Sequence, residues 1–457
     1  MDETLTLKAI SPLDGRYRSR IEPLALYFSE AALIKFRLYI EVHYFIFLSQ
    51  KGPRKFLSPP QVKKLLVLLD SFNDQDLLRI KEIEVKINHD TKAVEYFLRG
   101  KMMAVNLPGS GFVHFGLTSE DTDNLAYGLC LLKARKEILL PELKKLILKI
   151  AQMAGDFKTE SMLARTHGQP AVPTTMGKEL IVFCVRLFKE YQNLAGLPVE
   201  GKLNGAVGNY NAQLAAYPKF NWREFSQEFI ERLGLKPNLL TTQILPYDSV
   251  LKVFQSLFLI NQVLLGFDQD LWRYISGNYF LQTVNKNEVG SSTMPQKVNP
   301  IDFENSEGNL GVANALFNQF VEKLAVSRLQ RDMSDKTTKR NVGVALAHSF
   351  LAWQSTLRGL EKLTLNKKYL KEELLNHWEI ITEGLQTVLR TAGDPQAYEK
   401  VKNFTRGEEI NKEKINKFVK NLAVNQKVKN RLMTITPLNY LGLAEKLVDE
   451  GLKIIKF

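Results

Sequence analysis

The sequence TSEDTDNLAYGLCLLKARKEILLPELKKLILKIAQMAGDF, residues 118–157, carries the strongest structural signal in the chain. Its apolar residues recur at three- and four-residue spacing, the period of a helix, with one interruption at Pro141. At a rise of about 1.5 Å per residue such a helix is about 60 Å long, and a proline can kink it. Residues 118–121 are typical of a helix start, with hydroxyl groups at the cap and acids in the first turn.

Other long helical patterns occur at roughly 173–195, 246–276, 302–326 and 340–362. The stretch from about Pro23 to Ser49 is predicted to form one further helix. We find no convincing run of alternating apolar and polar residues that would be typical of strands. A monomer cannot easily bury both faces of helices this long. The patterns therefore predict an all-α fold in which a bundle of long helices is shared between subunits.

Glycine and proline divide the chain into predicted domains. Gly52-Pro53 and residues 58–60 separate shorter helices near the N-terminus, and residues 106–111 form a loop by composition. We therefore expect three helical domains. They are an N-terminal domain over residues 1–111, a central long-helix bundle over residues 112–365 and a C-terminal domain over residues 366–457.

The overall composition is that of a folded cytosolic enzyme. The 457 residues are 45% hydrophobic and 24% charged. Residues 1–4 lack the basic-then-apolar pattern of a signal peptide, and no run of about 18 uncharged apolar residues predicts a membrane span. Cys130 and Cys184 lie in apolar helical surroundings without metal-ligand spacing, so we expect two buried, reduced thiols and a cytosolic location.

The formal net charge of +13 allows three interpretations. A nucleic-acid-binding protein is one, but the chain shows no basic arm, zinc pattern or basic–aromatic ladder. Basic residues are spread along the whole sequence, which favours a solvated basic surface. The remaining interpretation is an electric field that attracts a multiply anionic small substrate.

Residues 288–300, EVGSSTMPQKVNP, join two of the predicted long helices. Two prolines forbid a continuous helix, and a connection of about twelve residues is longer than a bundle needs. The hydroxyls of Ser291 and Ser292, the backbone at Gly290 and the ammonium group of Lys297 can bind an oxyanion or a carboxylate. A polar surface linker is the alternative, and composition alone leaves both interpretations open.

This loop resembles the signature segment Gly-Ser-Ser-x-Met-Pro-x-Lys-x-Asn-Pro of the fumarase, aspartase and argininosuccinate lyase superfamily. Within that superfamily, three further segments are similar to the adenylosuccinate lyase family in its bacterial long-chain form. They are HDTKA at residues 89–93, ARTHGQPA at residues 164–171 and TTQ at residues 241–243. SPLDGRY at residues 11–17 and the run 328–343 are also similar, so the resemblance covers essentially the whole chain.

The resemblance implies β-elimination of fumarate from adenylosuccinate, giving AMP, and from succinyl-aminoimidazole-carboxamide ribotide, giving AICAR. A base removes a proton from the carbon next to a carboxylate, which places two negative charges on one carboxyl group and calls for preorganised donors. The family assigns the base to the serine that matches Ser291, and the acid that protonates the leaving nitrogen to the histidine that matches His167. Because a free serine hydroxyl is too weakly acidic, this role needs the turn at Gly290 and the charge of Lys297 to stabilise the alkoxide.

The histidines differ in how well they fit a functional role. Taken alone, His167 would more often be a hydrogen-bonded loop residue, here in a predicted rigid loop that enters a helix near Pro173. His89 matches a second histidine that contacts the substrate in the family. For His114 we favour a structural role. The histidines that fall in helical patterns and match nothing catalytic are His43, His348 and His377.

The resemblance also supplies a set of substrate contacts. Thr118-Ser119 is fully explained as a helix cap, yet the free N–H groups of a helix N-terminus also bind anions, and the family uses this pair to hold the succinyl group. The run 328–341 has the arginines and hydroxyls that a phosphate needs, although a charge run is usually a solvated surface. The other matching residues are Arg16, Tyr17, His89, Asp90, Thr91, Gln243, Ser292, Lys297, Asn299, Asn305, Arg331, Lys336, Thr337, Thr338 and Arg340.

Three departures from the family pattern concern nucleotide binding. Gln296 stands where the family usually has His, residues 245–247 read Leu-Pro-Tyr in place of Glu-Pro-His, and Lys336 replaces a residue that is usually Ser. None of them removes a proposed catalytic group. We therefore expect the activity to be kept and the affinity for the nucleotide to differ from that of typical family members.

The resemblance further implies a homotetramer built on the long-helix bundle, with sites shared between subunits and small-molecule nucleotide substrates. It implies no metal and no organic cofactor, and the sequence has no phosphate-cradling glycine-rich loop and no Cys/His ligand cluster. We expect neither nucleic acid nor membrane as a partner. The alternatives are another fumarate-releasing enzyme such as an argininosuccinate lyase, which the segment around His167 and the cluster around Arg331 disfavour, and a catalytically silent structural homologue.

Overall fold

The computed structural model describes residues 6–283, 293–294 and 296–457. Helices dominate this part of the chain, so the predicted all-α class is confirmed. The chain divides into two compact units. The first contains Met1–Leu143, Tyr191–Asn261 and Gly308–Ala352, and the second contains Lys144–Glu190, Gln262–Glu307 and Trp353–Phe457. The division into three domains after residues 111 and 365 stays a prediction.

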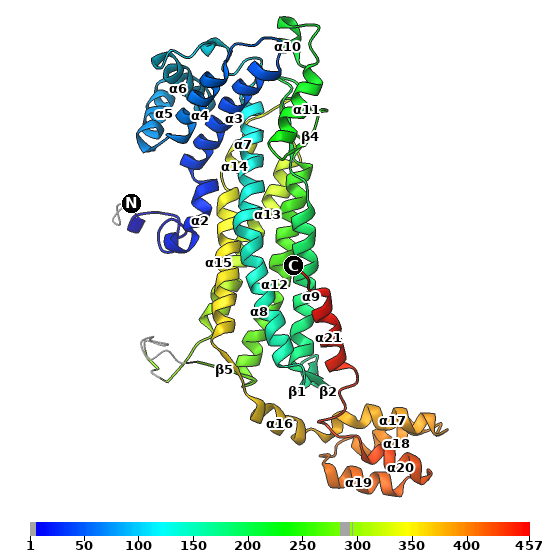
Figure 1. Cartoon of the computed structure of the whole chain (residues 1–457). Coiled ribbons are helices and arrows are strands. Elements are labelled where there is room, and N and C mark those ends of the chain that lie inside the picture. Colours follow the sequence, from blue (N-terminus) through cyan, green and yellow to red (C-terminus); the bar gives the residue numbers. More distant parts are fainter. Residues whose placement is uncertain (1–5, 284–292, 295) are drawn as a thin grey trace. The chain divides into compact units, whose positions relative to one another are not determined.

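Helices α2 to α7 form the N-terminal part of the first unit (Figure 1). They are α2 (Arg18–Phe28), α3 (Glu30–Lys51), α4 (Pro59–Asp70), α5 (Asp74–Ile87), α6 (Asp90–Ala104) and α7 (Ser119–Ala134), with the short 3-10 turn Ser110–Phe112 before α7. Helices α3 to α6 pack around a core that includes Phe45, Ile80 and Met102, all fully buried. The Asn73 side chain accepts hydrogen bonds from two backbone N–H groups at the start of α5, which otherwise have no partner within the helix.

The prediction of one helix from Pro23 to Ser49 is wrong, because the chain breaks at Ser29. Ser29 has an extended backbone, with ψ at 162°. Its hydroxyl oxygen accepts a hydrogen bond from the N–H of Ala32 at 3.0 Å, and the hydroxyl donates to the carbonyl of Ala25 at 2.7 Å. One serine side chain therefore ends α2 and caps α3, a local choice that the apolar period does not reveal.

The long helix predicted over residues 118–157 is confirmed, with a local change of winding. After α7 the chain forms one π-helical turn, Arg135–Leu139, and continues as α8 (Leu140–Asp156). Pro141 has no N–H group to donate, and its ring crowds the carbonyl four residues earlier. The wider turn directly before Pro141 relieves that crowding, so the helix continues through the proline.

The other long helices begin and end close to the predicted positions. They are α9 (Met176–Gly196), α12 (Asp248–Ser276), α13 (Ile301–Leu324) and α15 (Val342–Glu361), and the shorter α10 (Asn211–Ala216), α11 (Trp222–Arg232) and α14 (Ser334–Lys339) connect them. Aromatic pairs fill the space between them in each unit. In the first unit Phe254 stacks on Phe317 with ring centroids 5.7 Å apart, and in the second Phe183 meets Phe267 at 5.4 Å.

The expectation that the chain lacks strands is wrong. The described residues contain three two-stranded sheets. They are β1 (Ser161–Thr166) with β2 (Gln169–Thr175), β3 (Glu200–Gly201) with β4 (Lys236–Pro237), and β5 (Phe280–Gln282) with β6 (Leu363–Leu365). The first and third pairs are antiparallel and the second is parallel. The strands are so short, and β1 and β2 so mixed in polarity, that alternation gives no clear signal.

Small helices complete the second unit. They are α16 (Lys367–Asn376), the 3-10 turn Trp378–Ile381, α17 (Thr382–Thr391), α18 (Ala397–Thr405), α19 (Lys412–Asn421), α20 (Gln426–Met433) and α21 (Ala444–Ile454). Leu385, Val419 and Leu432 are fully buried in the core of α17 to α20. Helix α21 packs closely on α9, because a Cβ atom at Gly451 would lie only 2.4 Å from the side chain of Ile181.

Two further sequence expectations can be compared with the structure. Cys130 and Cys184 are both buried and form no disulfide, as predicted. Among the described helices, α12 has the length and hydropathy of a membrane span, with a mean hydropathy of 1.6 over an 18-residue window. Half of that window is buried in the protein, and the acidic residue Asp268 is buried within the helix, so α12 is a core helix.

Candidate functional site

The predicted catalytic His167 lies at the tip of the β1–β2 hairpin in the second unit. Thr166 pairs with Gln169, so His167 and Gly168 are the two residues of the turn, with φ angles of 54° and 76°. Positive φ at both positions is typical of the two-residue turns that follow the twist of a hairpin. The turn leaves the His167 side chain exposed. The predicted loop entering a helix near Pro173 is wrong, since Pro173 lies in β2 and α9 begins at Met176.

The hairpin is held in place by a partly buried carboxylate on α16, that of Glu373. The Arg165 guanidinium donates to Glu373 at 2.7 Å, and the Tyr279 hydroxyl donates to the same carboxylate. The Tyr279 oxygen also lies 3.3 Å from the carbonyl of Leu163 on β1. Burial, followed by the neighbouring carboxylate, raises the pKa of Tyr279 well above its ordinary value, so the hydroxyl keeps its proton. These residues line part of a cavity of 690 Å³ beside the turn.

The remaining predicted residues of the second unit lie around the start of α13. Lys297 is exposed, and its backbone N–H donates to the backbone carbonyl of Met294 at 3.0 Å. Asn305, on the first turns of α13, accepts a hydrogen bond from Ser355 at 2.8 Å. Asn299 precedes the helix and is partly buried. The predicted base, Ser291, and the predicted contact Ser292 lie outside the described residues.

In the first unit, the N-termini of α6 and α7 lie side by side. His89 is the N-cap of α6: its Nδ1 accepts a hydrogen bond from the N–H of Lys92 at 3.1 Å. In the neutral ring the proton is therefore on Nε2, which lies 3.5 Å from the hydroxyl oxygen of Ser119. Thr118 is the N-cap of α7, and its own N–H donates to Asp121 at 2.9 Å. The predicted helix start at residue 118 is confirmed, and the two helix ends together favour an anionic ligand.

The carboxylate of Asp90 is the centre of an ion-pair group beneath these helix ends. Arg37 donates to Asp90 at 2.9 Å and to Asp123 at 2.7 Å, and only 2% of its side chain is exposed. Lys336 approaches both oxygens of Asp90, at 3.2 and 3.4 Å. Burial opposes the charge of Asp90, but Arg37 and Lys336 hold its pKa well below the ordinary value. Thr91 is buried and donates to Asp123 at 3.2 Å, so the side chains of Asp90 and Thr91 are both engaged within the protein.

The segment around α14 contributes the basic residues of the predicted phosphate site. Arg331 donates from Nη1 to Glu120 at 2.8 Å, which ties it to the first turn of α7. Arg340 is largely exposed, with 58% of its side chain accessible, and lies 3.8 Å from Asp90. Thr337 is exposed, whereas Thr338 is buried and 7% accessible. Of the two threonines, only Thr337 therefore presents its side chain to a ligand.

Arg16, Tyr17 and Gln243 also lie in the first unit. The Arg16 guanidinium stacks 5.9 Å above the ring of Tyr17, at the start of α2. The side-chain amide of Gln243 donates to the backbone carbonyl of Ala206 at 3.0 Å, and the backbone carbonyl of Gln243 accepts from the buried Lys202 ammonium at 2.7 Å. Direct contacts thus connect the predicted residues at the starts of α6 and α7 with those around α14.

Comparison with known proteins identifies the family. Residues 15–314 match the protein family described as Lyase, and residues 327–441 match the family described as Adenylosuccinate lyase C-terminal. The adenylosuccinate lyase of Haemophilus influenzae is 46% identical over 451 residues, which cover 97% of this chain and 99% of that protein. The chain belongs to the adenylosuccinate lyase family. The adenylosuccinate lyase of Escherichia coli K12 is 44% identical over 453 residues, covering 98% and 99% of the two chains.

Solved structures of other enzymes have a fold similar to that of this chain. The 3-carboxy-cis,cis-muconate lactonizing enzyme from Pseudomonas putida has a TM-score of 0.75 at 17% identity, covering 95% of this chain and 96% of that one. A fumarate lyase from Mesorhizobium sp. BNC1 has a TM-score of 0.75 at 16% identity, covering 95% and 97%. These likenesses confirm the fold that the sequence resemblance predicts for this family.

Sequence reasoning missed the residues that hold the predicted contacts in place. Arg37 and Asp123 are buried on α3 and α7, and Glu120, Tyr247 and Lys339 are buried behind Arg331. Arg37 could have been noticed, because it interrupts the apolar pattern of α3 and an arginine is almost never fully buried unless it is paired. Its position therefore predicts a buried acidic partner. Among the described residues, no group of three His, Cys, Asp or Glu side chains is arranged to hold a metal ion.

Proposed function

We propose that this protein is an adenylosuccinate lyase that releases fumarate from adenylosuccinate and from succinyl-aminoimidazole-carboxamide ribotide. The observation that carries the proposal is full-length similarity: relatives named adenylosuccinate lyase are 44–46% identical and match 97–98% of this chain over 99% of their own length. All the predicted catalytic residue types are present in the sequence. The products would be AMP in the first reaction and AICAR in the second, with one fumarate each.

The first unit supports the binding of a doubly anionic ligand. Two helix N-termini meet at His89 and Ser119, where backbone N–H groups favour a carboxylate or a phosphate. Arg331 and Arg340 border the same group and supply donors with the geometry that phosphate prefers. We propose that the succinyl group contacts Thr118 and Ser119, and that Arg331, Thr337 and Arg340 bind the nucleotide phosphate.

The chemical step divides between a base and an acid. In our proposal the Ser291 oxygen removes a proton from the substrate carbon next to a carboxylate, and the C–N bond breaks as the C=C bond of fumarate forms. The exposed His167 imidazolium gives its proton to the leaving nitrogen. Lys297 stabilises the serine alkoxide and the doubly charged carboxyl group. The hairpin suits His167 to this role, because the two-residue turn with positive φ angles sets the direction in which the side chain leaves the backbone.

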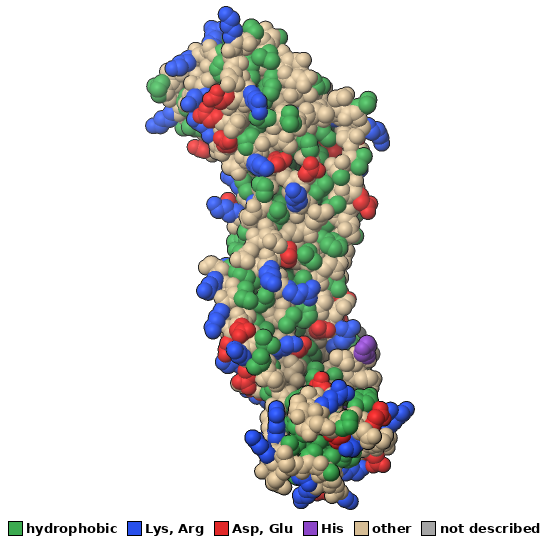
Figure 2. Space-filling model, turned by 90° about the vertical axis from the view of Figure 1, so that its right-hand side faces the viewer, with side chains coloured by type: hydrophobic (Ala, Val, Ile, Leu, Met, Phe, Trp, Pro, Cys, Tyr) green, Lys and Arg blue, Asp and Glu red, His purple; other side chains and the backbone are tan. Residues whose placement is uncertain are grey.

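We further propose that the chain assembles as a homotetramer whose sites combine residues of several subunits. Apolar residues on the long helices are exposed, among them Leu148, Val182, Leu259 and Val312, each between 44% and 46% accessible. Their burial against other copies would be favourable. On the face drawn in Figure 2, basic side chains are spread among acidic and hydrophobic ones and form no single patch, which supports a subunit surface over a nucleic-acid surface.

Shared sites predict complementation between inactive chains. Mixing Ser291→Ala with His167→Asn chains should restore part of the activity after subunit exchange, because some sites then combine an intact serine with an intact histidine. Subunit exchange is verified by mass spectrometry. If activity does not recover after verified exchange, each site is built within one chain. We propose a cytoplasmic location, in keeping with the buried thiols.

Substrate choice tests the proposed function. Purified protein is mixed with adenylosuccinate, the ultraviolet spectrum is followed as it changes to that of AMP, and the products are separated chromatographically. Argininosuccinate serves as the competing substrate. We expect conversion of adenylosuccinate alone. Conversion of argininosuccinate alone would point to the other lyase, and no conversion of either would point to a silent homologue.

A further inference from the structure

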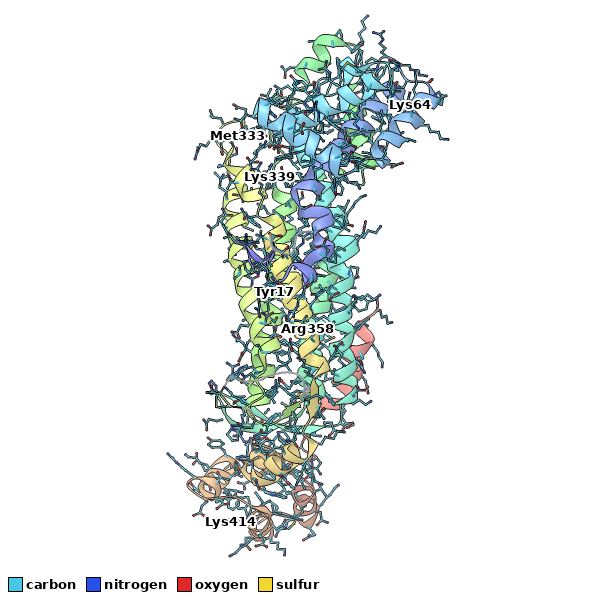
Figure 3. The ribbon with its side chains drawn as sticks, turned by 90° about the vertical axis from the view of Figure 1, so that its left-hand side faces the viewer. Tyr17, Lys64, Met333, Lys339, Arg358 and Lys414 are labelled. Atoms are coloured by element: carbon cyan, nitrogen blue, oxygen red, sulfur yellow. The ribbon has the colours of Figure 1, made fainter. Side chains whose placement is uncertain are left out.

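A second group of buried charges lies directly behind Arg331. Lys339 donates to the Tyr247 hydroxyl oxygen at 2.7 Å and lies 2.8 Å from Asp335 and 3.3 Å from Glu120. The Tyr247 hydroxyl donates to Asp335 at 2.9 Å and has its oxygen 3.2 Å from Glu120. Figure 3 labels Lys339, at the end of α14, and Met333, directly before α14. The four residues Glu120, Tyr247, Asp335 and Lys339 are called the charge clamp below.

The charge clamp is almost completely withdrawn from water. The side chains of Glu120, Lys339 and Asp335 are 0%, 4% and 9% accessible, and Tyr247 is 6% accessible. Burial alone would lower the pKa of Lys339, but Glu120 and its neighbours hold it well above the ordinary value, so the lysine stays charged. Burial raises the pKa of Tyr247 well above its ordinary value, so the hydroxyl stays neutral.

Stability is a weak explanation for such a group. Taking ions out of water costs about as much as their attraction returns, and apolar replacements of the same volume are often equally stable. Buried ion pairs are better suited to fixing geometry, because each partner tolerates only a few arrangements of the others. The charge clamp joins three segments far apart in sequence: the first turn of α7, the residue before α12 and the helix α14.

Arg331 is the residue that this geometry fixes. Its Nη1 is held by one oxygen of Glu120 at 2.8 Å, while the other oxygen of Glu120 faces Lys339. Its Nε lies 3.4 Å from the sulfur of Met333. The second amino group, Nη2, has no hydrogen-bond partner within the part of the chain that the structure describes. Two of the three guanidinium nitrogens are therefore held within the protein, and Nη2 is left to bind an anion.

We propose that Tyr247 and Lys339 are positioning residues that act through Glu120 to orient Arg331 toward an anionic group of the substrate. Lys339 neutralises one oxygen of Glu120 and fixes the carboxylate, which leaves the second oxygen for Arg331. The Tyr247 hydroxyl holds Lys339 between Glu120 and Asp335. This inference rests on the proposed function, since it concerns how that function binds its nucleotide.

The test separates binding from chemistry and from folding. Tyr247→Phe removes one hydroxyl and keeps the ring. We expect KM for adenylosuccinate to rise by roughly five- to tenfold, as for other residues coupled within one network, with kcat changed less than about twofold. Lys339→Arg keeps the charge with a different shape and should raise KM in the same direction. Tyr27→Phe is the matched control, because the buried Tyr27 also donates to a carboxylate, Glu137 at 2.5 Å, without contact to the charge clamp.

A double-mutant cycle decides whether the effect passes through Arg331. In the Arg331→Met background, Tyr247→Phe should no longer change KM, because the group it orients is gone. An equal increase in KM on adding Tyr247→Phe to the wild-type and to the Arg331→Met protein would overturn the proposal. A wild-type KM in both the Tyr247→Phe and the Lys339→Arg variants would also overturn it. If Tyr247→Phe does not fold, Lys339→Arg is carried through the same cycle. Failure of the proposed function itself would be seen separately, as a wild-type protein that forms no AMP.

Discussion

Lys336 offers the most specific test of the binding site, because it departs from the family pattern and the structure shows its partners. Its ammonium nitrogen lies 3.2 and 3.4 Å from the two oxygens of Asp90 and 3.7 Å from Asp123, with 20% of the side chain accessible. The lysine thus belongs to the ion-pair group around Asp90 and directly precedes the predicted phosphate contact Thr337 on α14. The perturbation is Lys336→Ser, which restores the residue type that the family usually has.

The structure sets the expected magnitudes. Asp90 keeps Arg37 at 2.9 Å and the N–H of Thr91 at 2.9 Å after the lysine is removed, so no buried carboxylate is left without a partner. We therefore expect a loss of about 1 kcal/mol in stability, or roughly 2–4 °C in Tm for units of this size. A charge-assisted hydrogen bond to the phosphate exceeds a neutral one by about 1 kcal/mol, which corresponds to an increase of about fivefold in KM.

The assay measures KM and kcat for adenylosuccinate at low and moderate ionic strength. For Lys336→Ser we expect a higher KM, a nearly unchanged kcat and a weaker dependence of KM on salt. Lys81→Ser is the matched control, since Lys81 also pairs with two carboxylates, Glu84 at 2.7 Å and Glu30 at 3.3 Å, on helices without predicted contacts. An unchanged KM with an unchanged salt slope would show that Lys336 acts only within the protein.

Three further predictions follow from the same contacts. His167→Asn should lower kcat by about 10²- to 10⁴-fold with normal folding, and a loss under about tenfold with an unchanged pH profile would exclude His167 as the acid. Glu373→Leu removes the carboxylate on α16 that holds Arg165 of the hairpin, and it should lower kcat by roughly 10²-fold with little change in KM, whereas an unaltered kcat would show that the anchor is dispensable. Arg37→Met removes the buried cation that pairs with both Asp90 and Asp123, leaving Lys336 as the nearest remaining cation, and should cost about 3–5 kcal/mol of stability, measured by urea unfolding. Because the folded pKa of Asp90 is depressed, the contribution of this pair is present above the unfolded pKa and is lost as pH falls, so wild type and Arg37→Met should converge in strongly acidic buffer, and a constant gap would contradict the assignment.

The long helices could be predicted from the sequence because their apolar period extends over many turns. Pro141 alone would suggest a break in the longest helix, yet a single π turn accommodates it. At Ser29 the apolar period continues while the hydroxyl makes two backbone hydrogen bonds, so the break was not predicted. The β1–β2 hairpin was missed for a related reason: the turn at His167-Gly168 requires positive φ angles, but the flanking segments do not alternate clearly.

The candidate site was predictable as a set of residue types and less so as a set of contacts. The motifs placed His89, Ser119 and Arg331 in one site, and the structure brings their helix ends together. The partners that fix them, such as Arg37 and Lys339, carry no motif of their own. Buried ion pairs depend on which side chains meet in space, and helical periodicity does not specify that. Asp90 and Thr91 have their side chains paired within the protein, and their roles as substrate contacts stay predictions.

The central claim is that this chain eliminates fumarate from adenylosuccinate by proton transfer at a carbon atom. The most direct measurement is a product balance with purified wild-type protein and the Ser291→Ala variant, with fumarate, aspartate and AMP each quantified by mass spectrometry. We predict that fumarate and AMP appear in equal amounts with wild type, and that neither appears above background with Ser291→Ala. Release of aspartate in place of fumarate, or equal turnover by the two proteins, would contradict the account.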